Sequence, residues 1–292
     1  MITVGTPLYT TTRTENLLSV DGVSLNFGSH KVLENVNFKI DKLTRVSAQN
    51  DSKQPQNSSN SVKTGQIVAF LGPSGIGKTQ LMRILAGLQR PTTGQVLIGK
   101  DHRPVSPGLV GLVSQNSLLY RNRTVLGNLI IAARQKHESN PRQIAQSMLE
   151  KFSLGALADL YPSQLSGGQR QRIAIAQQMA CSDHFLLMDE PTAGLDPIAK
   201  KVVCSLVSEV ANQDDLNTIG IVTHDIRSAL AVADTLYLLG RDRDKSGAIT
   251  SGAHIVMIYD LVERGLMWHP DVTKMPEFIE VEREVMERFE TL

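Results

Sequence analysis

The sequence predicts an α/β fold with a mainly parallel sheet, and three observations support this prediction. From Gly65 onward, short apolar runs that are typical of buried strands alternate with segments of helical periodicity. A glycine-rich loop stands between the first of these strands and the helical segment that follows it. The 292 residues are 41% hydrophobic and 20% charged, which is ordinary for a globular chain and excludes a fibrous or wholly disordered protein.

Residues 17–40, ahead of this region, are predicted to form short antiparallel strands. Apolar positions alternate on both sides of a Phe27-Gly28-Ser29 turn. Residues 47–64 then differ sharply in composition, because fifteen of the eighteen are Ser, Asn, Gln, Asp, Lys or Thr. Such a segment cannot bury enough apolar surface to offset the entropy lost on ordering, so we interpret it as an exposed insertion without a function of its own.

The predicted core strands are short and apolar. They are Gln66–Leu71, Val110–Ser114, Phe185–Met188, Thr218–Thr223 and Leu236–Leu239. After the first strand, a helix is predicted from apolar residues at helical spacing, namely Leu81, Ile84, Leu85 and Leu88. Strand patterns disappear between residues 116 and 164, where Val125–Arg134 and Pro141–Phe152 predict helices. This indicates a helical subdomain, at about residues 116–168, inserted into the core.

Residues 241–292 are predicted to form a C-terminal extension to a domain that spans residues 17–240. A strand pattern at His254–Ile258 is followed by a helical one. The apolar residues of that helix recur at spacings of three and four and are Phe278, Val281, Val285, Phe289 and Leu292. Six glutamates between residues 277 and 290 cover its other faces. Because apolar stripes usually face a core, we expect this helix to dock on the parent domain rather than on a partner.

Charge and cysteine content limit the possible classes of function. Thirty Lys and Arg against 29 Asp and Glu give a net charge of +1, which disfavours a nucleic-acid partner. The cysteines, Cys181 and Cys204, have neither CxxC spacing nor a nearby His pair, so no disulfide framework or zinc site is predicted. No run approaches 18 consecutive apolar residues, and residues 1–16 lack the order of a secretory signal. Any work at a membrane is therefore expected to proceed through a partner.

The motif with the clearest chemistry is GxxxxGK followed by Thr, at residues 72–79. It follows a predicted strand and opens a predicted helix, which is the context that a phosphate-binding loop requires. Gly75 and Gly77 let the backbone approach phosphate oxygens closely. Lys78 would neutralise the β- and γ-phosphates, and Thr79 offers a hydroxyl to Mg²⁺. The residues expected to contact the nucleotide are Gly72, Pro73, Ser74, Gly75, Ile76, Gly77, Lys78 and Thr79. Alone, the loop predicts a P-loop NTPase core and leaves kinase, GTPase and motor functions open.

Two carboxylates follow the apolar strand that begins at Phe185. Parallel sheets present ligand-binding groups at this end of their strands. Asp189 would hold Mg²⁺, directly or through water, and Glu190 would orient and polarise the attacking water. Capping of a helix N-terminus is the competing explanation for two acids after a strand. With Lys78 and Thr79 upstream, the catalytic explanation is favoured.

The segment LSGGQRQR, residues 165–172, separates the remaining alternatives. A Ser-Gly-Gly turn ahead of a helical pattern at Ile173–Met179 builds a second anion-binding helix start, although it is also an ordinary cap. At this point the sequence resembles the ATP-binding cassette (ABC) ATPases, whose signature is LSGGQ and whose strand-end motif is an apolar run ending in Asp-Glu. The resemblance covers roughly Val20–Gly240, with the motifs in the family's order.

The resemblance implies that two such domains pack head to tail. The partner's γ-phosphate would be contacted by the signature residues Ser166, Gly167, Gly168 and Gln169. Gln115 matches the Q-loop glutamine, which contacts Mg²⁺ and water. His224 matches the switch histidine, which contacts the γ-phosphate, and Asp196 matches the D-loop aspartate, which communicates across the dimer.

Two further contacts are implied where the sequence departs from the family pattern. Phe27 would stack on adenine, in a Phe-Gly pair where the family often has Tyr-Gly. Gln80 stands where a second Ser or Thr usually lies near the α-phosphate, and its amide can still donate a hydrogen bond.

The function implied by the resemblance is ATP hydrolysis coupled to solute transport, with ATP and Mg²⁺ as cofactors. The expected partners are a second nucleotide-binding domain, transmembrane permease subunits and a substrate-binding protein, with no nucleic acid. The chain would lie in the cytoplasm, peripheral on the inner face of the cell membrane. Its tail, with Trp268-His269-Pro270 and Pro276-Glu277-Phe278, resembles the nitrate, sulfonate and taurine importer subgroup.

Two alternatives remain at this point. One is a non-transport ABC ATPase acting in DNA repair, translation or complex assembly, which a single cassette without a coiled-coil insertion or basic bias disfavours. The other is a P-loop kinase or GTPase, in which the signature and His224 would have no role. The cargo, the direction of transport and the choice between homodimer and heterodimer are not encoded in these motifs.

Overall fold

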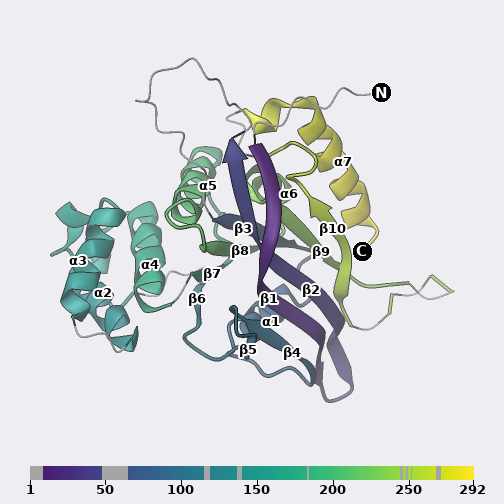
Figure 1. Ribbon diagram of the computed structural model, residues 1–292, viewed down its shortest axis with the longest axis horizontal. Coiled ribbons are helices and arrows are strands. Elements are labelled where there is room, and N and C mark those ends of the chain that lie inside the picture. Colours follow the sequence, from purple (N-terminus) through teal and green to yellow (C-terminus); the bar gives the residue numbers. More distant parts are fainter. Residues whose placement is uncertain are drawn as a thin grey trace.

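Two sheets and a helical lobe build the molecule (Figure 1). The computed structural model describes residues 9–47, 65–114, 119–136, 140–182, 184–243, 246–247, 249–250, 252–267 and 271–292. The antiparallel sheet has the strand order β2-β1-β4-β5, and the second sheet has the order β10-β9-β3-β8-β7-β6. The second sheet is parallel except for β10, which runs antiparallel to β9. The predicted fold class is confirmed.

The predicted core strands are confirmed with small shifts at their ends. They are β3 (Gln66–Leu71), β6 (Val110–Val113), β7 (Phe185–Asp189), β8 (Thr218–Thr223) and β9 (Thr235–Gly240). Every residue of β3, β8 and β9 is buried, which explains why these segments read as continuous apolar runs rather than alternating ones.

The N-terminal hairpin is longer than the short strands that the sequence predicts. β1 (Tyr9–Phe27) and β2 (His30–Ser47) pair along nearly their whole length, from Phe27 opposite His30 to Tyr9 opposite Ser47. The turn at Gly28, whose φ is 60°, sets the antiparallel register. The pairing then continues through polar residues, because backbone hydrogen bonds need no apolar side chains. Two short strands that the sequence reading missed, β4 (Thr93–Ile98) and β5 (Arg103–Pro104), complete this sheet.

An aromatic cluster joins the two sheets. Phe70 of β3 stacks on Tyr237 of β9 with 5.2 Å between ring centroids. Phe38 of β2 lies 5.3 Å from the first ring and 4.9 Å from the second. Burial of these rings fixes the antiparallel sheet over β3, whose carboxyl end leads into the glycine-rich loop.

Helix α1 (Lys78–Leu85) follows that loop but is shorter than predicted. Leu81, Ile84 and Leu85 are buried on it as expected, whereas Leu88 lies beyond its end and is 49% exposed. The helix stops because Gly87 takes a φ of 71°, and a Cβ at this position would lie 2.6 Å from the backbone of Ser106. The Leu88 prediction was wrong for this reason.

The helices predicted at Val125–Arg134, Pro141–Phe152 and Ile173–Met179 are confirmed, and the inserted subdomain at about residues 116–168 stays a prediction. α2 (Val125–Ala133), α3 (Pro141–Lys151) and α4 (Gly167–Cys181) group to one side of the sheets (Figure 1). No strand occurs within residues 119–136 and 140–164. α4 reaches back to the edge strand β6, where the Gln178 side chain accepts a hydrogen bond of 3.1 Å from the Leu112 amide.

The C-terminal segment packs into the same core as the parallel sheet. β10 (His254–Asp260) extends the sheet beside β9, and α7 (Pro276–Glu290) follows a 3₁₀ turn at Val272–Lys274. Phe278, Val281 and Val285 of α7 are buried, so the predicted docking of this helix on the parent domain is confirmed. The division at residues 240 and 241 stays a prediction.

Two further helices, α5 (Pro197–Ala211) and α6 (Ile226–Val232), lie on the same face of the sheet as α7. Among the described helices, none combines the length and the hydrophobicity that a membrane-spanning segment needs. Apart from Ser47 at the end of β2, the predicted insertion at 47–64 lies outside the residues that the structure describes.

Candidate functional site

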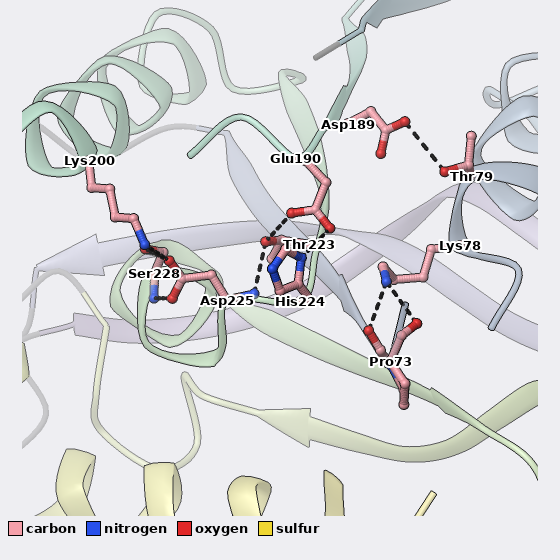
Figure 2. A network of polar contacts seen from close by, with 11 residues as sticks. Pro73, Lys78, Thr79, Asp189, Glu190, Lys200, Thr223, His224, Asp225 and Ser228 are labelled. Carbon is pink, nitrogen blue, oxygen red and sulfur yellow. Dashed lines mark hydrogen bonds and ion pairs between the residues drawn. The ribbon is translucent and has the colours of Figure 1, made fainter. Parts of the chain in front are cut away.

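The carboxyl ends of three neighbouring strands bring the predicted active groups together (Figure 2). β3 leads into the loop before Lys78 and Thr79, β7 ends in Asp189 and is followed by Glu190, and β8 is followed by His224. Because β3, β8 and β7 are adjacent parallel strands, side chains far apart in the sequence meet at one edge.

The glycine-rich loop leaves the start of α1 without a side-chain cap. Gly77 is the N-cap residue, with a φ of 112°, and no side chain accepts a hydrogen bond there. No side chain therefore competes with an anion for the amides of the first turn. Gly75 has a φ of 79°, and a Cβ there would meet no atom within 4 Å, so its face of the loop is open. Both observations fit a phosphate cradle.

Lys78 places a buried ammonium group in this loop. Its side-chain nitrogen donates hydrogen bonds to the main-chain carbonyls of Gly72 (2.8 Å) and Pro73 (3.0 Å), and the residue is only 7% exposed. Burial lowers the pKa of Lys78, while the charges of Glu190 and Asp189 act in the opposite direction. A partly desolvated cation beside open backbone amides is suited to hold an anion strongly.

Thr79 and Asp189 supply oxygen atoms next to the start of α1. The Thr79 hydroxyl donates to Oδ2 of Asp189 at 3.5 Å. Burial and the charge of Glu190 raise the pKa of Asp189, and the contacts with Thr79 and Lys78 oppose this rise. A hydroxyl and a carboxylate are the hard ligands that Mg²⁺ takes when phosphates and water complete its coordination, so these residues fit that ion.

Glu190 is held in a strained backbone conformation that aims its carboxylate at His224. Its φ is 48°, a left-handed value that costs an ordinary residue about 1–2 kcal/mol. One carboxylate oxygen accepts a hydrogen bond of 3.0 Å from the Thr223 hydroxyl, and the other lies 2.7 Å from Nδ1 of His224. The Glu190 amide also donates to the Val222 carbonyl at 2.8 Å. The strand end of β8 thus fixes both the backbone and the side chain of Glu190.

The signature segment forms the N-terminus of α4. Ser166 is the N-cap residue, and its hydroxyl accepts from the Gln169 amide at 3.3 Å, while the Gln169 side chain accepts from the Ser166 amide at 2.8 Å. Gly167 and Gly168 are exposed, and a Cβ on Gly168 would meet nothing within 4 Å. No hydrogen bond among the described side chains joins these four residues to the loop around Lys78.

A groove of about 420 Å³ runs from this helix start toward Glu190. It is lined by residues of α4, of the segment after β7 and of α5, including Gly167, Gly168, Gln171, Glu190, Pro191 and Leu195. The Gln171 side chain donates to the Pro191 carbonyl at 2.9 Å, which ties the helical lobe to the segment that follows β7.

The other predicted residues are Asp196, Phe27, Gln80 and Gln115. Asp196 caps α5 by accepting from the amides of Ile198 (2.8 Å) and Ala199 (3.0 Å), and hydrogen bonds from the backbone lower its pKa. Phe27 ends β1 and is 52% exposed. Gln80 is half-buried on α1, and Gln115 lies outside the part of the chain that the structure describes.

Three residues that hold Glu190 and the start of α6 in place were not predicted from the sequence. Thr223 holds both Glu190 and the amide of Asp225, the latter at 3.0 Å. Asp225 caps α6 by accepting from the Ser228 amide at 3.1 Å and forms an ion pair with Lys200 of α5. An Asp directly before a helical pattern is a capping signal that could have been used. Nothing in the sequence around Lys200 indicates a partner twenty-five residues away.

Comparison with known proteins agrees with this geometry. The family profile described as ABC transporter matches residues 55–193. The sulfate/thiosulfate import ATP-binding protein CysA of Nitrosomonas europaea is 31% identical over 290 residues, which cover 91% of this chain and 74% of the relative. CysA of Pseudomonas syringae is 36% identical over 234 residues, which cover 77% of this chain and 64% of the relative. CysA of Mesorhizobium japonicum is 37% identical over 191 residues, which cover 62% of this chain and 55% of the relative.

Solved structures give the same fold. The ATP-binding cassette MJ0796, in a dimeric post-hydrolysis state bound to ADP and phosphate, superposes with a TM-score of 0.61 at 25% identity over 84% of this chain and 99% of that chain. cbiO1 from Clostridium perfringens, part of the ABC transporter complex cbiONQ, gives a TM-score of 0.67 at 22% identity, with 94% of both chains covered.

The chain belongs to the family of ABC transporter ATP-binding proteins. It spans 55% and 64% of the length of the CysA relatives from M. japonicum and P. syringae.

Proposed function

We propose that this chain is the ATP-hydrolysing subunit of an ABC importer. The observation that carries the proposal is the convergence of Lys78, Asp189, Glu190 and His224 at one sheet edge, beside an uncapped helix start. A cation, a carboxylate positioned for a metal ion and a second carboxylate held by a histidine are the groups that phosphoryl transfer to water requires.

In this proposal the loop residues bind and orient the triphosphate. The amides between Gly72 and Gln80 would surround the phosphates, and Lys78 would exchange its two carbonyl partners for phosphate oxygens. Mg²⁺, when bound by Thr79, Asp189 and Gln115, would neutralise charge on the phosphates. Phe27 is proposed to stack on adenine, because the start of the adjoining strand β2 lies against the loop. A Cβ on Gly77 would approach the side chain of Val32 to 3.1 Å.

Glu190 is the proposed group that orients and polarises the attacking water. Its carboxylate is held from one side by Thr223 and from the other by His224, so it can turn little within the site. His224, at 54% side-chain exposure, faces outward and is the group proposed to sense the γ-phosphate. General-base assistance of this kind contributes roughly 10²–10⁴-fold to a rate.

The signature supports a dimer as the working form. Gly167 and Gly168 are exposed and have no packing role inside the chain, so the close approach that they permit is available to a second molecule. Ser166 and Gln169 would then face the γ-phosphate held by the partner, and Asp196 would lie near the dimer contact. The dimeric MJ0796 cassette supports this arrangement.

Transport is supported by the relatives rather than by any residue of the site. The CysA proteins of N. europaea and P. syringae are named as sulfate/thiosulfate import ATP-binding proteins. We therefore propose import of a sulfur oxyanion through separate permease subunits at the inner membrane face. These names favour sulfate or thiosulfate over the nitrate, sulfonate and taurine subgroup that the tail resembles. Trp268-His269-Pro270 of that tail lies outside the described residues.

The test of this function combines catalysis with capture. Glu190→Gln is expected to lower ATP turnover by at least about 100-fold while ATP binding persists, because the amide cannot accept the water's proton. Glu209→Gln, an exposed substitution on α5, is the matched control and is expected to leave turnover unchanged. If Glu190→Gln turned over at the wild-type rate, the assignment of the base would be wrong.

A tagged Glu190→Gln chain purified from native membranes with ATP and Mg²⁺ then tests transport. Stoichiometric recovery of an integral membrane protein is the expected result, and uptake of labelled sulfate against nitrate and taurine would identify the cargo. Recovery of ribosomal, DNA-bound or other soluble proteins alone would favour the non-transport alternative and would overturn the importer proposal.

A further inference from the structure

Helix α6 connects the site to the C-terminal segment. It begins two residues after His224, with Asp225 as its N-cap, and it is only seven residues long. Helices this short gain little stability from their own hydrogen bonds, so their position depends on what packs against them. α6 packs on the strands β3 and β8 and on the helices α5 and α7.

His224 lies between the end of β8 and the start of α6, where Asp225 is held by the Thr223 hydroxyl and by Lys200 of α5. On its N-terminal side, β8 is paired with both β3 and β7, which holds Thr223 firmly. On its C-terminal side, the path of the chain is set by the start of α6. Figure 2 shows Asp225 at this start, joined to Ser228 and Lys200, and His224 joined to Glu190.

Arg227, in the first turn of α6, is the residue that reaches the C-terminal segment. Its guanidinium forms an ion pair of 2.6 Å with Glu282 of α7 and donates to the Thr273 carbonyl at 3.2 Å. It also lies over the ring of the fully buried Phe278, 5.4 Å from the centroid. Three contacts from one side chain join α6 to the 3₁₀ turn and to α7.

We propose that Arg227 is a positioning residue, through which the docked α7 fixes the start of α6 and so holds His224 in line with Glu190. The inference rests on the proposed ATPase function, because His224 acts there on the γ-phosphate. An isolated exposed ion pair adds little to the stability of a protein. The Arg227 guanidinium, however, combines a charged partner, a carbonyl and an aromatic face, and such a network fixes orientation more strongly than a single pair.

A second arginine, Arg264, also pairs with a glutamate of α7 and serves as a matched control. Arg264 pairs with Glu284 of α7 at 2.6 and 3.4 Å, and it lies 5.2 Å from the ring centroid of Tyr259. This pair repeats the chemistry of the first, with an ion pair and an aromatic face. It joins α7 to β10 and the segment that follows, instead of to α6.

The experiment compares the two pairs in the purified full chain. Arg227→Glu is expected to lower kcat for ATP about tenfold, equivalent to about 1.4 kcal/mol, with less than a twofold change in KM. The double exchange Arg227→Glu with Glu282→Arg is expected to recover most of that rate. Arg264→Glu, and its double exchange with Glu284→Arg, are expected to keep kcat within about twofold of wild type.

Two readouts separate positioning from simple stability. In a His224→Ala background, Arg227→Glu is expected to cause no further loss of rate, because the effect passes through His224. Hydrogen exchange of the amides in residues 224–232 is expected to quicken in Arg227→Glu and to stay unchanged in Arg264→Glu.

The outcomes are distinguishable from failure of the proposed function. Unchanged kcat and unchanged exchange in Arg227→Glu, or equal losses from both pairs, would overturn the positioning role while leaving the ATPase assignment intact. An inactive wild type would overturn the ATPase assignment, and the exchange of residues 224–232 would still decide whether α7 holds α6.

Discussion

The two glycine-rich helix starts of this chain are alike in sequence and different in surroundings. α1 begins at Gly77 with no side-chain cap, next to the buried Lys78 and within reach of Asp189. α4 begins after Ser166 with a complete capping box and with both glycines exposed. The N-terminus of α1 has uncapped amides with a lysine and an aspartate nearby. At the N-terminus of α4, the Ser166 hydroxyl already accepts a hydrogen bond from the Gln169 amide.

This difference indicates which helix N-terminus can bind a phosphate using residues of one chain alone. A phosphate at α1 would find the amides, an ammonium and a metal-binding carboxylate of the same chain. At α4, Gly167 and Gly168 offer close approach, but no hydrogen bond among the described residues joins their segment to the loop around Lys78. In the proposed dimer the two starts meet across a twofold axis, so that each completes the other.

The largest expected effect comes from removing the cation at α1. Lys78→Ala is expected to abolish detectable ATP binding and to lower hydrolysis by at least about 100-fold, because a buried charge-assisted contact to phosphate is lost. Lys201→Ala, an exposed lysine on α5, is the control. The measurement is the affinity of each variant for a fluorescent ATP analogue. Normal binding by Lys78→Ala would contradict the assignment of α1 as the phosphate site.

A substitution at α4 is expected to separate binding from hydrolysis. Gly168→Asp would keep ATP binding in the single chain and lower hydrolysis about 10- to 100-fold, because a carboxylate would repel the partner's phosphate. Gly155→Asp, also in the helical lobe and also facing open space, is expected to be silent.

Mixing Lys78→Ala with Gly168→Asp sharpens this test, since mixed dimers would contain one intact composite site. Equal mixing is expected to restore up to about a quarter of the wild-type rate for a twofold dimer, and no recovery would contradict the head-to-tail arrangement.

The smallest expected effect concerns the contribution of Asp189, at the end of β7, to the stability of the fold. The raised pKa of Asp189 means that its ionised form opposes folding without Mg²⁺. That penalty is present above the folded pKa and disappears below the ordinary value of 3.8, where the carboxyl is protonated in both states. Asp189→Asn is therefore expected to melt at a higher temperature than wild type at neutral pH, with the gap closing as the pH falls. A lower melting temperature at neutral pH would contradict this reading.

The residues proposed to bind and hydrolyse ATP were more predictable from the sequence than the residues and strands that hold them in place. The loop at residues 72–79 and the pair Asp189 and Glu190 were predictable because phosphate chemistry requires particular residue types at fixed spacing. The long β1–β2 hairpin was not, because backbone pairing continues through polar residues that carry no apolar signal. Thr223 and Lys200 were missed for another reason, since their partners lie 33 and 25 residues away and only the packing of β7, β8 and α5 brings them together.

The left-handed backbone of Glu190 has a consequence for protein engineering. At a φ of 48°, glycine or asparagine would be tolerated more readily than glutamate. Selection for thermal stability alone would therefore favour replacement of Glu190. The enriched variants would be more stable but would lack the proposed general base. Directed evolution of this chain needs an activity screen at every round.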